Sequence, residues 1–299
     1  MSFVSPADEQ RIPLGAGLEL VLAGALWGFG FVATVWALND MGPLMLTLFR
    51  FAWISLIGFP LLMLVPRWRR TLSMSQWRLS FWPGFWLAAT IIIQTFGLRY
   101  TSASKSGFIT TLYVLMVPAL ESFWHKRRLP RRHWFYAFVA LLGVALMMDL
   151  QKTGWNVGDG LTLVCAVAAT LQIFWFGLIA EKIESALTFN LLQSSWAALI
   201  ALPAALIFEP WPKFPLSNIS FLGLIALTFG STAIAFGLQI KAQRVISPSR
   251  SSLFFLLESP FAALFAYILL GEVLSPSQWC GGLLILVSLS LSTLRAVKN

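Results

Sequence analysis

Residues 248–282 read PSRSSLFFLLESPFAALFAYILLGEVLSPSQWCGG, and they place an acidic residue inside a long apolar run. The 23 residues from 248 to 270 are almost continuously apolar, long enough as a helix to cross a hydrocarbon core of about 30 Å. Glu258 lies near the middle of this run. A carboxylate at that depth costs about 2.5–3.5 kcal/mol on insertion scales, so we expect it to be retained for a reason. Pro260 removes a backbone donor two residues later, which predicts a kink beside Glu258.

The composition of the whole chain agrees with a membrane protein. Of its 299 residues, 58% are apolar and 11% are charged, whereas a soluble domain is about 25% charged. The net charge of +9 would suggest nucleic acid in a soluble protein, but the basic residues fall between apolar runs, so we expect no nucleic-acid partner. Cys165 and Cys280 can build neither a disulfide framework nor a metal cluster, and we expect no metal and no cofactor.

Hydropathy predicts an all-α membrane protein with ten transmembrane helices. The predicted spans are residues 18–38, 43–64, 79–98, 104–124, 133–150, 160–180, 189–208, 219–240, 248–270 and 277–294. If the amino terminus is cytoplasmic, the inner segments hold sixteen Lys and Arg residues and the outer segments hold four. This asymmetry predicts a multi-pass protein of the inner (plasma) membrane with both termini in the cytoplasm.

An internal repeat relates the two halves of the chain. Shifting residues 99–146 by 145 positions aligns Arg99 with Arg244, Ser106 with Ser251 and Trp134 with Trp279, and makes Pro118 the nearest counterpart of Pro260. Residues 1–152 and 153–299 then hold five spans each. Because five is odd, the second half enters the membrane from the opposite side, which predicts two inverted five-helix repeats in one integral membrane domain.

Three stretches of the sequence carry a resemblance to a known family. Glu258-Ser259-Pro260, Leu270-Gly271-Glu272 and Pro276-Ser277-Gln278-Trp279 resemble the carboxy-terminal signature of the EamA family in the drug/metabolite transporter superfamily. Residues 100–110 (YTSASKSGFIT) with Tyr113 and Pro118 resemble its fourth span, and Pro43 with Arg50 resembles its second span. Ser259 and Ala169 depart from the family pattern. The resemblance implies a carrier of amino acids or other small metabolites, with a central pathway between inverted halves.

Arg50 and Glu258 are the charged residues that lie deepest in the predicted spans. Arg50 could anchor a substrate carboxylate, because its planar guanidinium matches two oxygens, or it could lock helices together. Glu258 could bind a proton as a gate or pair with a substrate ammonium group, or it could be a protonated acid that joins helices. Both alternatives stay open for each residue.

Uncharged polar and aromatic residues within the spans are the other candidates for a substrate cavity. Polar side chains in a membrane need partners, so we expect Gln94, Tyr113 and Gln172 to face the interior of the bundle. Trp27, Trp86 and Trp175 could stack on a flat substrate or pack against neighbouring helices. The predicted site therefore joins these six residues to Arg50 and Glu258, with Pro118 and Pro260 as hinges.

The function that these features favour is a secondary transporter. We expect it to export small metabolites, hydrophobic or aromatic amino acids above others, by alternating access, with lipid as its surroundings and protons considered as a coupling ion. One alternative is a membrane adaptor or sensor, which predicts a filled interior. An intramembrane enzyme is the other alternative. The two histidines of the chain, His125 and His133, both lie near a membrane face, and the sequence holds no catalytic motif. We therefore predict no catalytic residues.

The charge asymmetry generates a prediction about topology. In a background without native cysteines, Asn156→Cys should react with an impermeant thiol reagent added to intact cells, because residue 156 lies in a predicted outer loop. Ser73→Cys should react only after the cells are permeabilised. Labelling of Ser73→Cys in intact cells would contradict the orientation.

Overall fold

The computed structural model describes residues 12–101, 103–126, 131–147, 155–212, 214–271 and 273–294, and within these ranges it contains helices and no strands. In chain order the helices are α1 (Leu14–Ala37), α2 (Pro43–Leu64), α3 (Pro66–Arg69), α4 (Met74–Leu79), α5 (Phe81–Gly97), α6 (Ala103–Thr111), α7 (Tyr113–His125), α8 (Arg131–Met147), α9 (Val157–Ile179), η2 (Ala180–Lys182), α10 (Ala186–Phe208), α11 (Asn218–Ile225), the π-helix η3 (Ala226–Ala235), α12 (Phe236–Ala242), α13 (Pro248–Phe255), α14 (Glu258–Leu270) and α15 (Pro276–Leu294).

Six helical segments of the described chain are long and apolar enough to cross a membrane by themselves. They are Leu14–Ala37, Pro43–Leu64, Val157–Lys182, Ala186–Phe208, Asn218–Ala242 and Pro248–Leu269. Helices that are apolar on all sides are typical of membrane spans, because lipid and protein interior are equally apolar neighbours. The other apolar ranges correspond to the shorter helices α5, α8 and α15 and to the broken pair α6 and α7.

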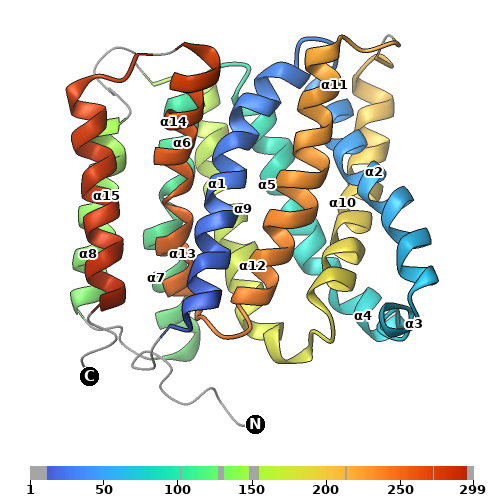
Figure 1. The fold of residues 1–299 in the computed structure, drawn as a ribbon, viewed down its shortest axis with the longest axis horizontal. Helices are drawn as coiled ribbons and strands as arrows, with labels where there is room; N and C mark the ends of the chain where they lie inside the picture. The colour runs from blue at the N-terminus through green and yellow to red at the C-terminus, as the bar shows by residue number, and fades with distance from the viewer. Residues whose placement is uncertain are drawn as a thin grey trace.

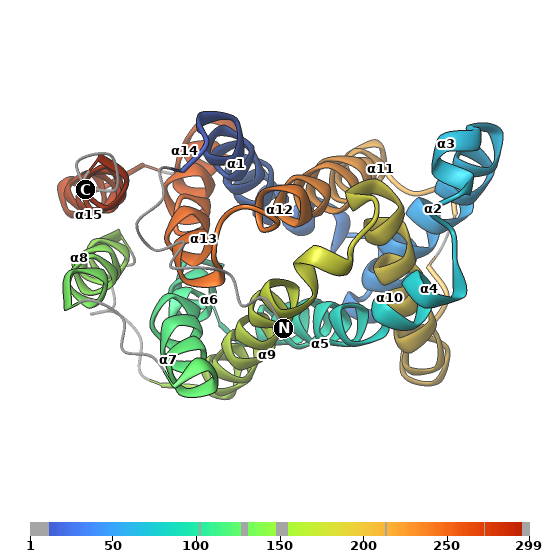
Figure 2. The ribbon, with the colours of Figure 1, turned by 90° about the horizontal axis from the view of Figure 1, so that it is seen from below.

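The long helices stand side by side in Figure 1, and α1 begins and α15 ends at the lower face of that view. We call this the lower face and the opposite one the upper face. Figure 2 looks along the helices and shows α8 and α15 as a pair at one edge, with α2, α3 and α4 at the other edge. The remaining helices surround the centre of the molecule (Figure 2).

Two of the predicted spans are broken near their midpoints. The helix started by Pro248 ends at Phe255 and restarts at Glu258. Pro260 cannot donate to the carbonyl of Leu256 four residues earlier, and this carbonyl accepts instead from Ser259 N at 3.2 Å. The other break lies at Leu112, between α6 and α7, whereas Pro118 lies inside α7. The interruption that the sequence predicts beside Glu258 therefore falls directly before that residue.

The breaks occur at matching places in the two halves of the chain. Helices α6, α7 and α8 begin at residues 103, 113 and 131, and helices α13, α14 and α15 begin at residues 248, 258 and 276. Each pair of starts is 145 residues apart, which is the offset of the sequence repeat. Tyr113 and Glu258, which align at this offset, are thus the first residues of equivalent helices.

Carboxylates hold the loops of the upper face. Glu209 accepts hydrogen bonds from Leu44 N (3.1 Å) and Met45 N (2.9 Å), so its charge lies at the amino-terminal end of α2, where the helix dipole favours an anion. Asp40 accepts from Ser217 N at 2.7 Å, and the Ser217 side chain and backbone together lower the pKa of this exposed carboxyl. The loop before α2 and the first turn of α2 are therefore tied to the two ends of the 209–217 connection.

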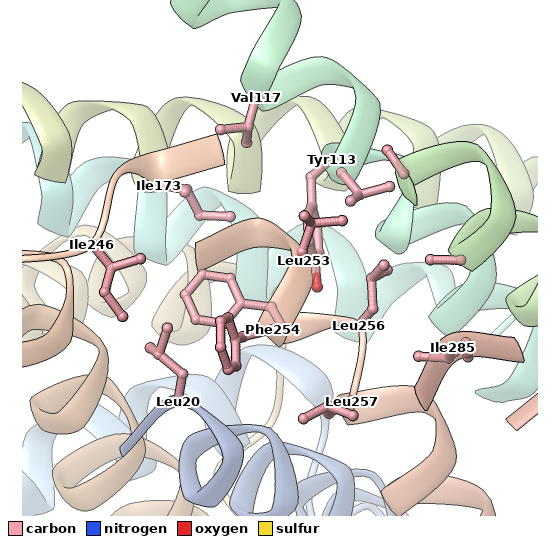
Figure 3. Close-up of a cluster of buried hydrophobic side chains, with 14 of the residues drawn as sticks. Leu20, Tyr113, Val117, Ile173, Ile246, Leu253, Phe254, Leu256, Leu257 and Ile285 are labelled. Atoms are coloured by element: carbon pink, nitrogen blue, oxygen red, sulfur yellow. The ribbon is translucent and has the colours of Figure 1, made fainter. Parts of the chain in front are cut away.

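The largest apolar cluster packs α1 against α7, α9 and α13. Figure 3 shows Leu20 of α1 and Tyr113 of α7 on opposite sides of Phe254 and Leu256. Close approach of α1 to α14 depends on Gly28, because a Cβ atom there would lie 2.7 Å from Ala262 N and 2.9 Å from the Glu258 carbonyl oxygen. These are backbone atoms that cannot turn aside. A glycine of α1 thus determines how near Glu258 can come.

This contact predicts a difference between two glycines of the same helix. Gly28→Ala should lower the melting temperature of the purified protein, since overpacking typically costs about 1–3 kcal/mol and outweighs the gain of up to about 1 kcal/mol in helix propensity. Gly15→Ala is the matched control, because nothing lies within 4 Å of a Cβ atom at Gly15. Equal melting temperatures for the two variants would contradict the packing argument.

Candidate functional site

A cavity of about 100 Å³ lies at the centre of the molecule, lined by helices from both halves of the chain. Thr34, near the end of α1, and Leu98, directly after α5, both line it, so it extends toward the upper face. Six of the predicted site residues line this cavity, although they come from six different helices: Trp27, Arg50, Gln94, Tyr113, Gln172 and Glu258.

Arg50 is buried in α2, with 6% of its surface exposed, and its partners are neutral hydroxyl groups. Nη2 donates to Ser231 Oγ at 2.7 Å, and Nε donates to Thr232 Oγ1. No carboxylate oxygen forms a salt bridge with Arg50 among the residues that the structure describes. The guanidinium therefore keeps its positive charge uncompensated by direct ion pairing, at the wall of a cavity.

Glu258 reaches the same cavity from the start of α14. The break before it turns the amino-terminal end of α14 toward the centre, and the partial positive charge of that helix end favours a carboxylate in the first turn. Arg50 and Glu258 thus present a guanidinium and a carboxyl group to one space without a salt bridge between them. This arrangement can hold a small molecule that carries a positive and a negative charge.

Polar groups without partners complete this wall. Tyr113 Oη, Gln172 Nε2 and Gln239 Oε1 are buried, and within the described residues none of these atoms has a hydrogen-bond partner. Gln94 makes one long bond, from Nε2 to Thr110 Oγ1 at 3.4 Å. Since a buried polar atom without a partner is costly, these atoms are available to a ligand that enters the cavity.

Aromatic rings also line the cavity. Trp27 lies 5.2 Å from Phe236 and 5.1 Å from Phe255, measured between ring centroids, and its Nε1 donates to the Ser231 carbonyl at 3.2 Å. Phe236, Phe255 and Gln239 were not predicted as site residues. Nothing in the sequence distinguishes Phe236 and Phe255 from the other phenylalanines of the spans, because a phenylalanine can face lipid, a neighbouring helix or a cavity at equal cost.

Trp86 and Trp175 do not line the cavity, in contrast to the prediction. Each lies about one turn closer to the lower face than a residue that does line it, Trp86 below Thr90 and Trp175 below Gln172. Trp86 packs on Phe85 and Trp175 on Trp82, with centroid distances of 4.9 and 5.8 Å. Both tryptophans therefore lie below the residues that line the cavity.

Direct contacts between helices close the space below the cavity. Gln243, directly after α12, donates from Nε2 to the carbonyl of Ile173 in α9 at 3.2 Å. Pro248 of α13 comes so near to Gly177 that a Cβ atom there would lie 2.3 Å from Pro248 Cγ. The cavity thus has lining residues near the upper ends of α1 and α5, and these two contacts join helices on its lower side.

Comparison with known proteins identifies the family of the chain. The EamA-like transporter family matches twice, over residues 16–149 and 156–294. An uncharacterized transporter of Archaeoglobus fulgidus is 29% identical over 94% of this chain and 87% of its own length. A probable amino-acid metabolite efflux pump of Salmonella typhimurium is 25% identical (92% and 94%), and an S-adenosylmethionine/S-adenosylhomocysteine transporter of Chlamydia muridarum is 27% identical (86% and 85%).

A solved crystal structure shares the fold, with a TM-score of 0.77 over 95% of this chain and 98% of the other at 18% identity. The two family matches cover nearly the whole chain, and the relatives are described as transporters or efflux pumps rather than enzymes. The resemblance seen in the sequence motifs is confirmed. This multi-pass membrane protein belongs to the EamA-like transporter family.

Proposed function

We propose that the protein is a secondary transporter that exports small metabolites, with hydrophobic or aromatic amino acids favoured. The observation that carries this proposal is the cavity, in which Arg50 and Glu258 face one space without a salt bridge between them. An amino acid supplies a carboxylate for the guanidinium and an ammonium group for the carboxylate. A membrane adaptor or sensor would need no such space, so the cavity favours a carrier.

The preference for apolar side chains follows from the rest of the wall. Trp27, Phe236 and Phe255 offer area and ring edges to an aromatic or aliphatic side chain. Once Arg50 and Glu258 hold the backbone groups of the cargo, a third charge would meet only apolar or neutral groups. Acidic and basic amino acids should therefore be disfavoured.

Alternating access between two repeats is the transport mechanism that we propose. Residues 1–152 and 153–299 would form two inverted repeats with ten membrane-crossing helices in total. The common 145-residue offset of the helix starts and the two family matches support the repeat. A cavity lined near the upper ends of α1 and α5, with Gln243 bonded to Ile173 below it, fits one end state of such a cycle.

In the cell we propose an inner-membrane protein with the lower face in the cytoplasm. The exposed arginines of α3 and α4 lie at this face, which agrees with the excess of basic residues expected on the cytoplasmic side (Figure 1). The structure would then be open to the outside. Protons are the coupling ion that we propose, with Glu258 as their site.

The substrate proposal predicts a ranking in counterflow. Proteoliposomes loaded with phenylalanine should take up labelled phenylalanine, tryptophan and leucine at least about tenfold faster than glutamate or lysine, a ratio equivalent to about 1.4 kcal/mol. The measurement compares initial rates at equal concentration, with protein-free liposomes as the control. Glutamate or lysine entering as fast as phenylalanine would exclude the preference.

The coupling proposal predicts the behaviour of one variant. Glu258→Gln keeps the shape and hydrogen-bonding capacity of the side chain but cannot release a proton, so an imposed pH gradient should no longer change its transport rate. Glu181→Gln is the matched control, because Glu181 is exposed in η2 and does not line the cavity, and it should leave the response to the gradient intact. An unchanged response in Glu258→Gln would remove Glu258 from the coupling step.

A further inference from the structure

The span from Asn218 to Ala242 changes its winding beside the cavity. Residues Ala226–Ala235 form the π-helix η3, and two of them, Leu227 and Ser231, line the cavity. The side chain of Thr232 follows the same wide spacing, since Oγ1 donates to the Leu227 carbonyl five residues earlier at 2.8 Å. π-helical turns are rare, and they occur frequently at functional sites.

Side chains from three other helices bind one turn of η3. Trp27 of α1 donates to the Ser231 carbonyl at 3.2 Å. Asn190 of α10 donates from Nδ2 to the Thr232 and Ala233 carbonyls, both at 2.9 Å. Arg50 of α2 donates to the hydroxyl groups of Ser231 and Thr232. Rewinding η3 as an α-helix would turn these acceptors away from their donors, so the three side chains favour the π form.

Of these three donors, Arg50 is the one that a charged cargo can take away. A charge-assisted bond to a carboxylate is roughly twice as strong as a bond to a neutral group, and the guanidinium fork matches two carboxylate oxygens. Arg50 now binds two neutral hydroxyl groups at the edge of the cavity. A carboxylate in the cavity would compete with Ser231 and Thr232 for the same N–H groups.

Loss of these bonds would be felt on the lower side of the molecule. Helix α12 follows η3 without interruption. Gln243, just after α12, donates to the Ile173 carbonyl, and this hydrogen bond joins the two helices below the cavity. Lys241 of α12 also pairs with Glu19 of α1. A change from the π spacing to the α spacing rotates everything beyond it about the helix axis, so these contacts depend on the winding of η3.

We propose that η3 is the conformational switch of this carrier and that Arg50 sets it according to whether a carboxylate occupies the cavity. The inference rests on the proposed function and adds to it the chemical group that is sensed. In the state described here Arg50 braces the π form and the lower side is shut. A carboxylate-bearing cargo draws Arg50 away from Ser231 and Thr232, η3 rewinds, and α12 moves away from α9. Arg50 acts here as a positioning residue.

The test measures a distance across the lower side. Spin labels on Val245→Cys, after α12, and Glu181→Cys, after α9, are placed in a Cys280→Ser background; both sites are exposed, whereas Cys165 is fully buried. In lipid nanodiscs, phenylalanine and 3-phenylpropanoate should each change the mean distance by at least about 2 Å, the scale of helix shifts in switching proteins. 2-Phenylethylamine, which lacks the carboxylate, should not. Equal responses to all three compounds, or no response to either carboxylate, would overturn the proposal.

A second arm needs no ligand. Ser231→Ala combined with Thr232→Val removes both acceptors of Arg50, so the ligand-free distance should already match the carboxylate-bound one, and carboxylates should change it no further. The matched control is Ser55→Ala with Ser195→Ala. It removes a hydroxyl–hydroxyl hydrogen bond of 3.0 Å between α2 and α10, and neither serine lines the cavity. If the Ser231/Thr232 variant behaves like this control, η3 is not the switch.

The two proposals fail separately. Counterflow that is absent for every amino acid, with a distance that still responds to carboxylates, would reject the proposed cargo and keep the switch. Counterflow of phenylalanine with an unresponsive distance would reject the switch and keep the transporter.

Discussion

The hydrogen bonds from Arg50 to Ser231 and Thr232 are the interaction on which the centre of this protein depends. A guanidinium in a membrane interior needs partners, because neither lipid tails nor apolar side chains can accept hydrogen bonds from its N–H groups. Here the partners are hydroxyl groups of another helix rather than a carboxylate. The charge is thus held in place without being neutralised. This leaves α2 joined to η3 and leaves a positive site at the cavity wall.

The irregular backbone of the spans gathers around the same cavity. The breaks at Leu112 and before Glu258 and the π-helix η3 all lie where the chain borders it. Irregular winding leaves backbone groups that lipid cannot satisfy, so it is tolerated where protein or a cavity surrounds it. Asn190 illustrates this, since its Nδ2 donates to two carbonyls of η3. Its Oδ1 in turn accepts a hydrogen bond from Gln193 Nε2 at 2.8 Å.

Charge and polarity in the sequence point to residues that line the cavity, because such residues are forced inward. Arg50, Glu258 and Gln172 could be identified because each is costly to expose to lipid, and all three line the cavity. Trp86 and Trp175 were misplaced, and Phe236 was missed. An aromatic ring is equally at home against lipid, a neighbouring helix or a cargo, so its position along the chain does not say which it meets. The sequence also does not show how far the cavity extends toward the lower face.

The sequence by itself determined that the chain is a helical membrane protein, where its apolar runs lie, and which few groups cannot face lipid. These properties follow from local composition, since the cost of placing a residue in the bilayer depends on that residue. The repeat offset of 145 residues was also readable, and the helix starts share it. Only the tertiary structure decided that Arg50 meets Ser231 and Thr232, that Gln243 closes against Ile173, and that residues 226–235 wind as a π-helix. These depend on which helices touch and in which rotation, and helices that are apolar on every side carry no periodic pattern that would specify it.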